Sequence, residues 1–260
     1  SSVEKNKKKN IKNFFSKFDH NLNLDNFITS KLSLSIEKVT NDTYLRVFDG
    51  NIVNTVLKPT NLNNLKNQLI LELDHENYFF ESGIESYESL NKQSNDKYQY
   101  VLPYYNFNKI LSQNSFNGSI NFNSSGNNDL SETNVLKTKI INDISYTGFD
   151  LINDYGFKNN LSISIKNLNS VGKNDSELKN SPQIELMSVF KADTSLPLQK
   201  KSSKYLSYFT PKLSMLINPS DMKNHAETKR KINNENIFDI NRLGLTDSLE
   251  AGKSLTIGLD

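Results

Sequence analysis

The stretch from Asn233 to Asp260 reads NNENIFDINRLGLTDSLEAGKSLTIGLD, and its two halves differ in character. The first half is polar and rich in turn-forming residues. In the second half apolar residues alternate with small or polar ones: Leu255, Ile257 and Leu259 against Ser254, Thr256 and Gly258. Because successive side chains of a strand point to opposite faces, this alternation predicts a strand with one apolar and one polar face.

The same alternation recurs along the chain, each time after a polar stretch. We predict strands in residues 32–37, 44–48, 68–74, 98–107, 116–123, 136–146, 161–166, 183–190, 206–217 and 249–259. No helical period persists, so the pattern predicts an all-β antiparallel sheet of roughly ten or eleven strands. The run from Leu136 to Tyr146 has the length that a tilted transmembrane strand requires.

Between these runs the sequence is polar, and we predict connections in residues 81–97, 124–129 and 191–204. Two prolines carry further expectations. Pro103 lacks the amide hydrogen that a central ladder needs, so it should lie at a strand start or rim. The apolar parity switches at Pro211, which predicts a bulge or bend there.

Composition narrows the classes of protein. Apolar residues make up 35% of the 260 residues, against roughly 45–50% in soluble domains when Gly is counted too. A membrane barrel needs fewer, because only one face of each strand meets lipid. The 15 Phe and 11 Tyr argue against disorder. No apolar run reaches the roughly 18 residues of a membrane helix, and the net charge of +2 offers no electrostatic case for nucleic acid.

The apolar face of such a sheet must be covered, and two solutions stay open. The sheet can close and face lipid, as in a transmembrane barrel, or pack on a second sheet, as in a soluble sandwich. In the barrel five apolar residues of matching parity should face outward: Leu32, Leu71, Ile120, Ile163 and Ile257. Aromatic residues near predicted strand starts would form an interfacial girdle in a barrel or ordinary core in a sandwich: Tyr104, Tyr105, Phe107, Tyr205, Tyr208 and Phe209.

Catalytic chemistry finds little support in the sequence. The chain has no cysteine, and His20, His75 and His225 stand in polar stretches without ligands at metal-binding spacing. We therefore expect no enzyme activity, no metal site and no cofactor. Lys5 and the run Lys7–Lys9 are expected to be a solvated segment rather than an anion-binding patch.

Four segments, in order, resemble the LPS-assembly protein LptD family. The most specific is Asn236–Leu243, read Asn-Ile-Phe-Asp-Ile-Asn-Arg-Leu and followed by Asp247, Glu250 and Gly252. The others are 36–49, 101–107 and 208–213. Three departures accompany the last motif: Leu243 stands where the family has Phe, residues 244–246 where it has Ser-Gly-Tyr, and Ser248 where it has Arg.

The resemblance implies that the chain is the wall of an antiparallel up-and-down transmembrane β-barrel, with residues 1–260 inside one outer-membrane domain. The family's jelly-roll and the strands that close the barrel have no counterpart here, and neither end looks natural, so we expect an internal fragment of a larger protein. The implied function is lipopolysaccharide transport and assembly at the cell outer membrane. Implied partners are lipopolysaccharide, outer-membrane lipid, an LptE-like lipoprotein plug and an LptA-like periplasmic bridge.

The alternatives are a diffusion porin or a soluble β-sandwich adhesin. Five residues form a predicted structural turn motif: Asn241, Arg242, Asp247, Glu250 and Gly252. Arg242 could form a two-bond ion pair with a carboxylate that holds the turn, or it could be an exposed loop charge. Residues that contact ligand are not assigned.

Overall fold

The computed structural model describes residues 12–48, 50, 57–59, 61–92, 94–221 and 231–259. Within these residues the chain is almost entirely β, with a single helical turn α1 (Tyr44–Val47) and a 3-10 turn η2 (Ser94–Lys97). The first strands are β1 (Asn13–Asn21), β2 (Thr29–Val39), β3 (Asn64–His75), β4 (Tyr78–Ser89), β5 (Tyr98–Ser115), β6 (Gly118–Ser131) and β7 (Val135–Gly148). The remaining strands are β8 (Leu151–Ile152), β9 (Lys158–Lys173), β10 (Gln183–Ser195), β11 (Leu198–Lys201), β12 (Leu206–Phe209), β13 (Pro211–Asn218) and β14 (Gly252–Leu259).

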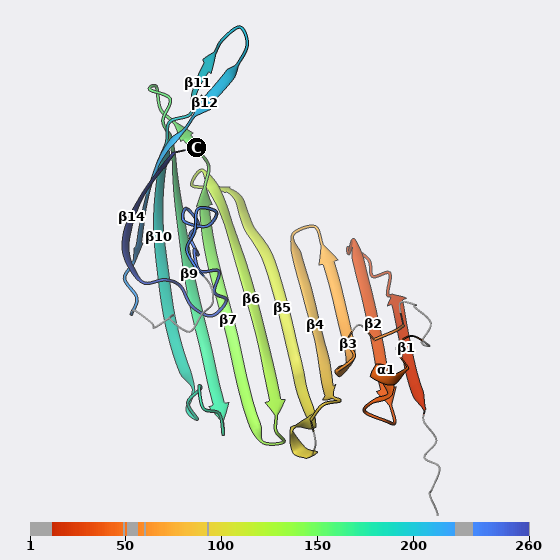
Figure 1. The fold of residues 1–260 in the computed structure, drawn as a ribbon. Coiled ribbons are helices and arrows are strands. Elements are labelled where there is room, and N and C mark those ends of the chain that lie inside the picture. Colours follow the sequence, from red (N-terminus) through yellow and green to blue (C-terminus); the bar gives the residue numbers. More distant parts are fainter. Residues whose placement is uncertain are drawn as a thin grey trace, which may run out of the picture. The chain divides into compact units, whose positions relative to one another are not determined.

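Twelve of the described strands form one antiparallel sheet in which neighbours in sequence are neighbours in space (Figure 1). Its order is β1-β2-β3-β4-β5-β6-β7-β9-β10-β13-β14, and β8 pairs with β9. Strands β11 and β12 form a separate two-stranded sheet. The predicted all-β, antiparallel, up-and-down fold is confirmed. No helix in the described part of the chain is both long and apolar enough to cross a membrane.

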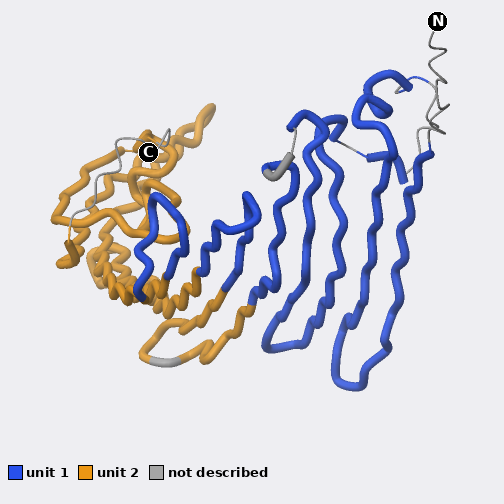
Figure 2. Tube along the Cα trace, turned by 90° about the horizontal axis from the view of Figure 1, so that it is seen from below, with its two compact units in different colours: residues 1–106, 126–138, 171–181 blue, residues 107–125, 139–170, 182–260 orange. Residues whose placement is uncertain are grey.

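The chain divides into two compact units (Figure 2). Unit 1 comprises residues 1–106, 126–138 and 171–181, and unit 2 comprises residues 107–125, 139–170 and 182–260. Each unit is described by itself below.

In unit 1 the strand register sorts side chains onto an apolar and a polar face. Leu34 pairs with Leu69, and Leu69 pairs with Ile84, so the three lie in a row. The next row along the strands consists of Ser35, Gln68 and Glu85. Leu34, Leu69 and Ile84 are between 36% and 44% exposed, so nothing described in the unit covers the apolar row. Leu32 and Leu71 pair on the same face.

The small buried core of unit 1 lies at one end of its sheet. Leu45 of α1 is fully buried against Val39, Leu65 and Leu90. Residues 44–48 therefore form a helical turn, and the predicted strand there is wrong. The physical reason is local: the Asn41 side chain accepts hydrogen bonds from the backbone N–H and hydroxyl of Thr43, and the turn that follows directs Leu45 into the cluster.

Unit 2 shows the same partition more strongly. Leu213 of β13 pairs with Ile257 of β14, and Met215 pairs with Leu255. Ile257 is 75% exposed and Leu255 is 65% exposed. Ile163 shares this face through its pairing with Phe190. The opposite face holds buried residues, which are Leu168, Met187, Val189 and Leu216.

Several predicted boundaries are wrong because polar residues extend strands as well as apolar ones do. Strand β4 occupies much of the predicted connection 81–97, β6 runs through 124–129, and β10 continues to Ser195. A ladder is held by backbone hydrogen bonds, which Ser, Asn and Gly supply without an apolar side chain. In β6 the ring of Tyr105 covers Gly126, whose absent side chain leaves room for it.

Other corrections concern single residues. Phe116 lies in the turn before β6, with a positive φ of 53°, and not in the strand. Pro103 lies inside β5 rather than at its start. Pro211 begins β13, so the parity switch marks the boundary between two strands that belong to different sheets. The last strand starts at Gly252 rather than near Leu249. The basic run Lys5 and Lys7–Lys9, and His225, lie outside the described residues.

Candidate functional site: the polar face of the sheet

In unit 2 the segment 231–251 folds back over the polar face of the sheet (Figure 1). Leu249, which is 5% exposed, joins the buried cluster of Leu168, Met187, Val189 and Leu216. Ile240 packs against the same cluster from the same segment. The apolar side chains on the otherwise polar face therefore pack against this segment, and this packing holds the segment in place.

Arg242 and Glu250 close this segment on itself. The guanidinium of Arg242 donates from Nε to Oε2 of Glu250 at 2.9 Å and from Nη2 to Oε1 at 2.6 Å. Arg242 is 8% exposed. The backbone carbonyl of Glu250 also accepts a hydrogen bond from the Asn218 side chain at 2.8 Å, which ties the segment to the end of β13. Parallel charge-assisted bonds of this kind are the strongest polar contacts that side chains make.

Asn241 organises the turn that presents Arg242. Its side-chain oxygen accepts the backbone N–H of Leu245 at 3.2 Å, and its side-chain nitrogen donates to the carbonyl of Leu245 at 2.8 Å. Its own carbonyl accepts from the N–H of Gly244 at 2.9 Å, and Gly244 has a positive φ of 57°. One asparagine thus satisfies the backbone groups of a tight turn that lacks regular secondary structure.

Two lysines on the polar face of the sheet bind segment 231–251. Lys139 of β7 forms an ion pair with Asp247 at 3.0 Å. Lys166 of β9 is almost fully buried, donates to Asp143 at 2.7 Å, and donates to the backbone carbonyl of Thr246 at 2.7 Å. The segment is therefore held by charge as well as by apolar packing.

Glycine at position 258 lets the segment approach β14 closely. A Cβ at Gly258 would lie 2.6 Å from the ring of Phe238, a distance that side chains do not tolerate. Phe238 also lies under the ammonium of Lys212, 5.9 Å from the ring centroid. Gly252 has a φ of 100°, a conformation that favours glycine, at the point where the segment enters β14.

The structure thus brings Arg242 and Glu250 together and sets Asn241, Asp247 and Gly252 at three other points of one segment. That these five residues act as a structural motif stays a prediction, which the mutations in the Discussion address. Sequence reasoning missed Lys139, Lys166 and Phe238. Lys166 carried a signal: it is a charged residue on the polar parity of an otherwise regular strand, where a partner above the sheet is the simplest explanation.

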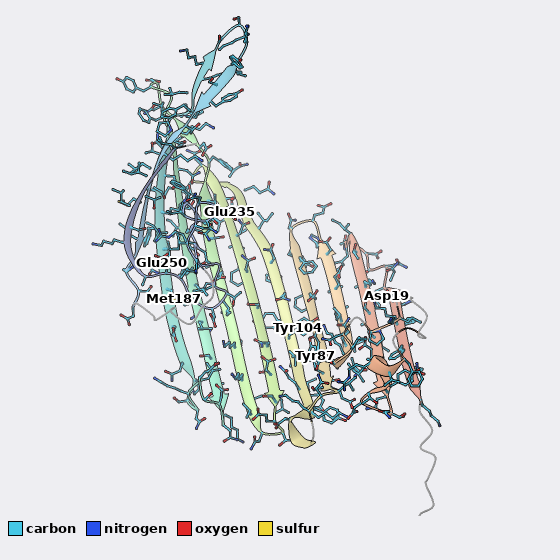
Figure 3. The ribbon with its side chains drawn as sticks, viewed as in Figure 1. Asp19, Tyr87, Tyr104, Met187, Glu235 and Glu250 are labelled. Atoms are coloured by element: carbon cyan, nitrogen blue, oxygen red, sulfur yellow. The ribbon has the colours of Figure 1, made fainter. Side chains whose placement is uncertain are left out.

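The polar face of unit 1 carries a network of charges and tyrosines. Lys66 pairs with Glu85 at 2.8 Å, and the hydroxyl of Tyr87 donates to the same carboxylate at 2.5 Å. Farther along, Lys31 pairs with Asp19 at 3.1 Å. A Cβ at Gly83 would lie 2.9 Å from the ring of Tyr104, so this ring covers the glycine. Tyr104 and Tyr87 are labelled in Figure 3. The face is thus lined with hydrogen-bonding groups rather than with apolar surface.

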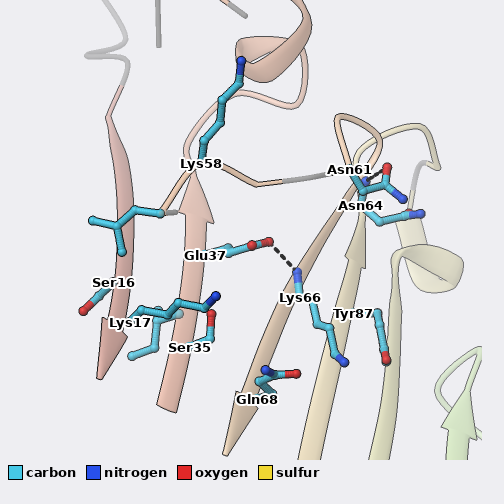
Figure 4. Close-up of a pocket in the computed structure, with 12 residues that line it drawn as sticks. Ser16, Lys17, Ser35, Glu37, Lys58, Asn61, Asn64, Lys66, Gln68 and Tyr87 are labelled. Atoms are coloured by element: carbon cyan, nitrogen blue, oxygen red, sulfur yellow. Dashed lines mark hydrogen bonds between the residues drawn. The ribbon is translucent and has the colours of Figure 1, made fainter. Parts of the chain in front are cut away.

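A cavity of about 370 Å³ opens on this face where β2 and β3 separate (Figure 4). Their pairing ends at Ser35 and Gln68, although each strand continues beside its other neighbour. Side chains then replace the lost ladder: Glu37 accepts the backbone N–H of Lys66 at 2.8 Å, and Asn67 accepts that of Glu37 at 2.8 Å. The cavity lining is mostly polar and includes Lys17, Gln68 and Tyr87.

The described residues hold no group of three or more His, Cys, Asp or Glu side chains that could bind a metal ion. His75 stacks on Tyr78 with ring centroids 4.6 Å apart, and its Nδ1 accepts the backbone N–H of Asn77. These contacts are those of a turn residue.

A family model described as LPS transport system D, LptD, matches residues 13–260. The chain belongs to the LptD family. The match covers nearly the whole chain, so the resemblance carried by the four sequence segments is confirmed. Comparison with curated proteins found no match.

Membership of the LptD family indicates the general function of the chain. LptD proteins are outer-membrane proteins of lipopolysaccharide transport and assembly. The family therefore favours transport over the diffusion-porin and adhesin alternatives.

Proposed function

We propose that residues 1–260 form part of the wall of one outer-membrane barrel domain of an LptD-type protein. In this proposal the apolar face of the sheet contacts the hydrocarbon of the cell outer membrane. The polar face bounds a hydrophilic passage through which the sugar part of lipopolysaccharide crosses, while its acyl chains stay in the membrane. No covalent bond is made or broken.

The observation that carries the proposal is the partition of side chains within each unit. Leu69 and Ile257 are exposed on the apolar face, and no second layer of described residues covers them. Burying such side chains stabilises a protein by about 25 cal/mol for each Å² removed from water. A sheet that leaves them exposed on one face and carries charges on the other fits contact with lipid better than contact with water.

The polar face suits a passenger rich in hydroxyl and phosphate groups. Lysines on this face, such as Lys17 and Lys66, are donors for phosphate oxygens, and Gln68 and Tyr87 can hydrogen-bond a sugar. The cavity between β2 and β3 falls within the size range of small-ligand pockets, roughly 300–1,000 Å³. We propose that the sugar part of lipopolysaccharide contacts the polar face as a whole, and we assign no individual contact residues.

The partners proposed with this function are those of the transport system. An LptE-like lipoprotein would occupy the interior of the barrel as a plug. An LptA-like protein would deliver lipopolysaccharide from the periplasmic side. Membership of the family supports partners of the transport system in general, and the two named partners belong to the proposal.

Neighbouring residues of β3 allow a direct test. Gln68 lies on the polar face and Leu69 lies on the apolar face of the same strand. A photo-crosslinking amino acid is placed at each position in cells, and adducts are probed for the sugar and acyl parts of lipopolysaccharide. We expect the crosslink at position 68 to map to the sugar part of lipopolysaccharide and the crosslink at position 69 to map to acyl chains, of phospholipid or of lipopolysaccharide. Crosslinks to the sugar part in equal yield at both positions, or at neither, contradict the proposal.

A further inference from the structure

The hairpin of β11 and β12 differs from every other described part of unit 2. It is a separate sheet in which Leu198 pairs with Phe209 and Lys201 pairs with Leu206. It projects beyond the ends of the neighbouring strands β10 and β13 (Figure 1). All eight of its strand residues are exposed. An isolated two-stranded hairpin is at best marginally stable in water, so this one needs something to cover it.

The exposed residues of the hairpin indicate what kind of surface would cover it. Tyr205 is 73% exposed, Tyr208 is 67% exposed, and Phe209 is 49% exposed. Three lysines, Lys200, Lys201 and Lys204, stand among them, and residues 198–209 contain no acidic residue. Tyrosine and lysine combine an apolar body with a polar tip, the chemistry that suits the headgroup layer of a membrane. The excess positive charge of residues 198–209 selects anionic headgroups.

The hairpin is continuous with the face that the proposed function assigns to lipid. The backbone N–H of Leu196 donates to the carbonyl of Pro211 at 3.0 Å and closes the base of the hairpin. Pro211 pairs with Leu259, which is 65% exposed on the apolar face. The hairpin thus begins where the apolar face of β13 and β14 ends.

A second exposed segment lies beside the base of the hairpin. A Cβ at Gly156 would lie 3.7 Å from the side chain of Leu196, so the connection 149–157 borders the hairpin. This connection exposes Ile152 at 66% and Tyr155 at 84%. The two segments together form one aromatic end of unit 2, which we name the hairpin end. Its lysines all come from residues 198–209, and residues 149–157 contain Asp150 and Asp154.

Connection lengths indicate which leaflet the hairpin end meets. At the hairpin end of unit 2 lie the turn 116–117, the connection 149–157 and the hairpin connection 196–210, and the longest connection of the unit, 219–251, leaves β13 at the opposite end. Outer-membrane barrels have short turns on the periplasmic side and longer loops outside. This places the hairpin end at the periplasmic leaflet, where the headgroups are those of glycerophospholipids.

We propose that the hairpin β11–β12, with residues 149–157, anchors the chain in the periplasmic leaflet by inserting its aromatic residues among anionic phospholipid headgroups. The proposal rests on the proposed function, because it takes the apolar face of β13 and β14 as the lipid-facing wall.

The chain contains no tryptophan, so a single introduced tryptophan reports on one position. Three variants are made: Tyr208→Trp in the hairpin, Ile257→Trp on the apolar face, and Phe238→Trp on the polar face. Each is reconstituted in phosphatidylcholine vesicles with or without phosphatidylglycerol, brominated near the headgroup or deep in the acyl chains. We expect Tyr208→Trp to be quenched most by shallow bromine, Ile257→Trp most by deep bromine, and Phe238→Trp by neither.

Charge is tested in the Tyr208→Trp background. Replacing Lys200, Lys201 and Lys204 by Gln should remove the extra shallow quenching that phosphatidylglycerol produces. The matched change Lys253→Gln, in β14, should leave that quenching unchanged. Quenching of Tyr208→Trp that never depends on phosphatidylglycerol overturns the choice of anionic lipid.

The outcomes separate this inference from the function beneath it. If Ile257→Trp is quenched by deep bromine and Tyr208→Trp fluoresces as in water, the wall faces lipid and the hairpin anchor is wrong. A hairpin that docks on a partner protein instead of lipid also leaves Tyr208→Trp fluorescing as in water, because these vesicles contain no partner protein. If Ile257→Trp is quenched by neither lipid, the proposed function itself fails.

Discussion

Arg242 binds Glu250 through two parallel hydrogen bonds, from Nε to Oε2 at 2.9 Å and from Nη2 to Oε1 at 2.6 Å. The two residues come from opposite ends of a turn that has no regular secondary structure, and Arg242 is 8% exposed. This pair closes the segment 231–251 where it lies over the polar face of unit 2. Whether segment 231–251 stays over the polar face therefore depends on a few contacts, and each of them can be removed by a single mutation.

Removing the guanidinium should loosen the segment. Arg242→Met leaves the Glu250 carboxylate without its two donors, and we expect unfolding to become easier by about 2–3 kcal/mol, because breaking a largely buried pair leaves an uncompensated charge. Arg242→Lys should recover only part of this, since an ammonium cannot form the parallel bonds. Urea titration in vesicles measures the effect. Lys253→Met, an exposed site in β14, is the control, and an equal loss there contradicts the prediction.

Leu249 is the apolar anchor of the same segment. Leu249→Ala removes a side chain that is 5% exposed from the cluster with Met187 and Val189, and we expect a loss of about 2–4 kcal/mol. Cleavage of segment 231–251 by added protease should rise in parallel while the strands stay protected. The equivalent change Leu255→Ala removes a side chain that is 65% exposed on the opposite face. It should leave the cleavage of the segment unchanged.

Close contact between Gly258 and Phe238 predicts a coupled pair. Gly258→Ala forces a methyl group to within 2.6 Å of the Phe238 ring, so the ring must leave its position over β14. We expect Gly258→Ala to increase protease cleavage of segment 231–251. In the Phe238→Ala background the same change should have a much smaller effect. A double-mutant cycle with purely additive effects would show that the two residues do not interact.

Acid should open the connection between β9 and β10. The Lys137 ammonium, 2.9 Å away, and the backbone N–H of Leu178 lower the pKa of Asp175 below its ordinary value. A carboxyl whose pKa is lowered by folding contributes stability that is present above its unfolded pKa of about 3.9 and is lost as the pH falls through the folded pKa. We expect residues 174–182 to become accessible to an acid-active protease only below about pH 4.

Two variants check the origin of this acid sensitivity. In Lys137→Gln the largest cause of the lowered pKa is gone, so the connection should be more accessible already at neutral pH, and its opening should depend less on pH. Glu177→Gln removes a mostly exposed carboxylate that contacts the same lysine, and it should shift the opening far less. If Glu177→Gln shifts it as much as Lys137→Gln does, Asp175 is not the controlling group.

The alternation of side chains predicted much of the fold. The pattern at Leu161–Lys166 placed Ile163 and Lys166 on opposite faces of one strand, and β9 has them there. It failed where strands are built of Ser, Asn and Gly, as at 124–129 in β6, because a polar strand and a polar loop have the same composition. It also failed at residues 44–48, where the contacts of Leu45 decide for a helical turn.

The candidate site was less accessible to sequence reasoning. Asn241, Arg242 and Glu250 stood out because they lie close together in one motif. The partner of Asp247, Lys139, lies 108 positions away, and the contact of Thr246 with Lys166 spans 80 positions. Nothing in the local pattern couples residues at such separations.

Two faces of opposite polarity follow from the order of residues alone, because the backbone of any strand turns successive side chains to opposite sides. Membership of a family of transport proteins was also readable from short ordered motifs. The position of segment 231–251 over one of those faces was not, because it depends on contacts between residues that only the pairing of β7, β9, β13 and β14 brings together. The contacts of Leu249, Phe238, Lys139 and Lys166 can be identified only once the pairing of the strands is known.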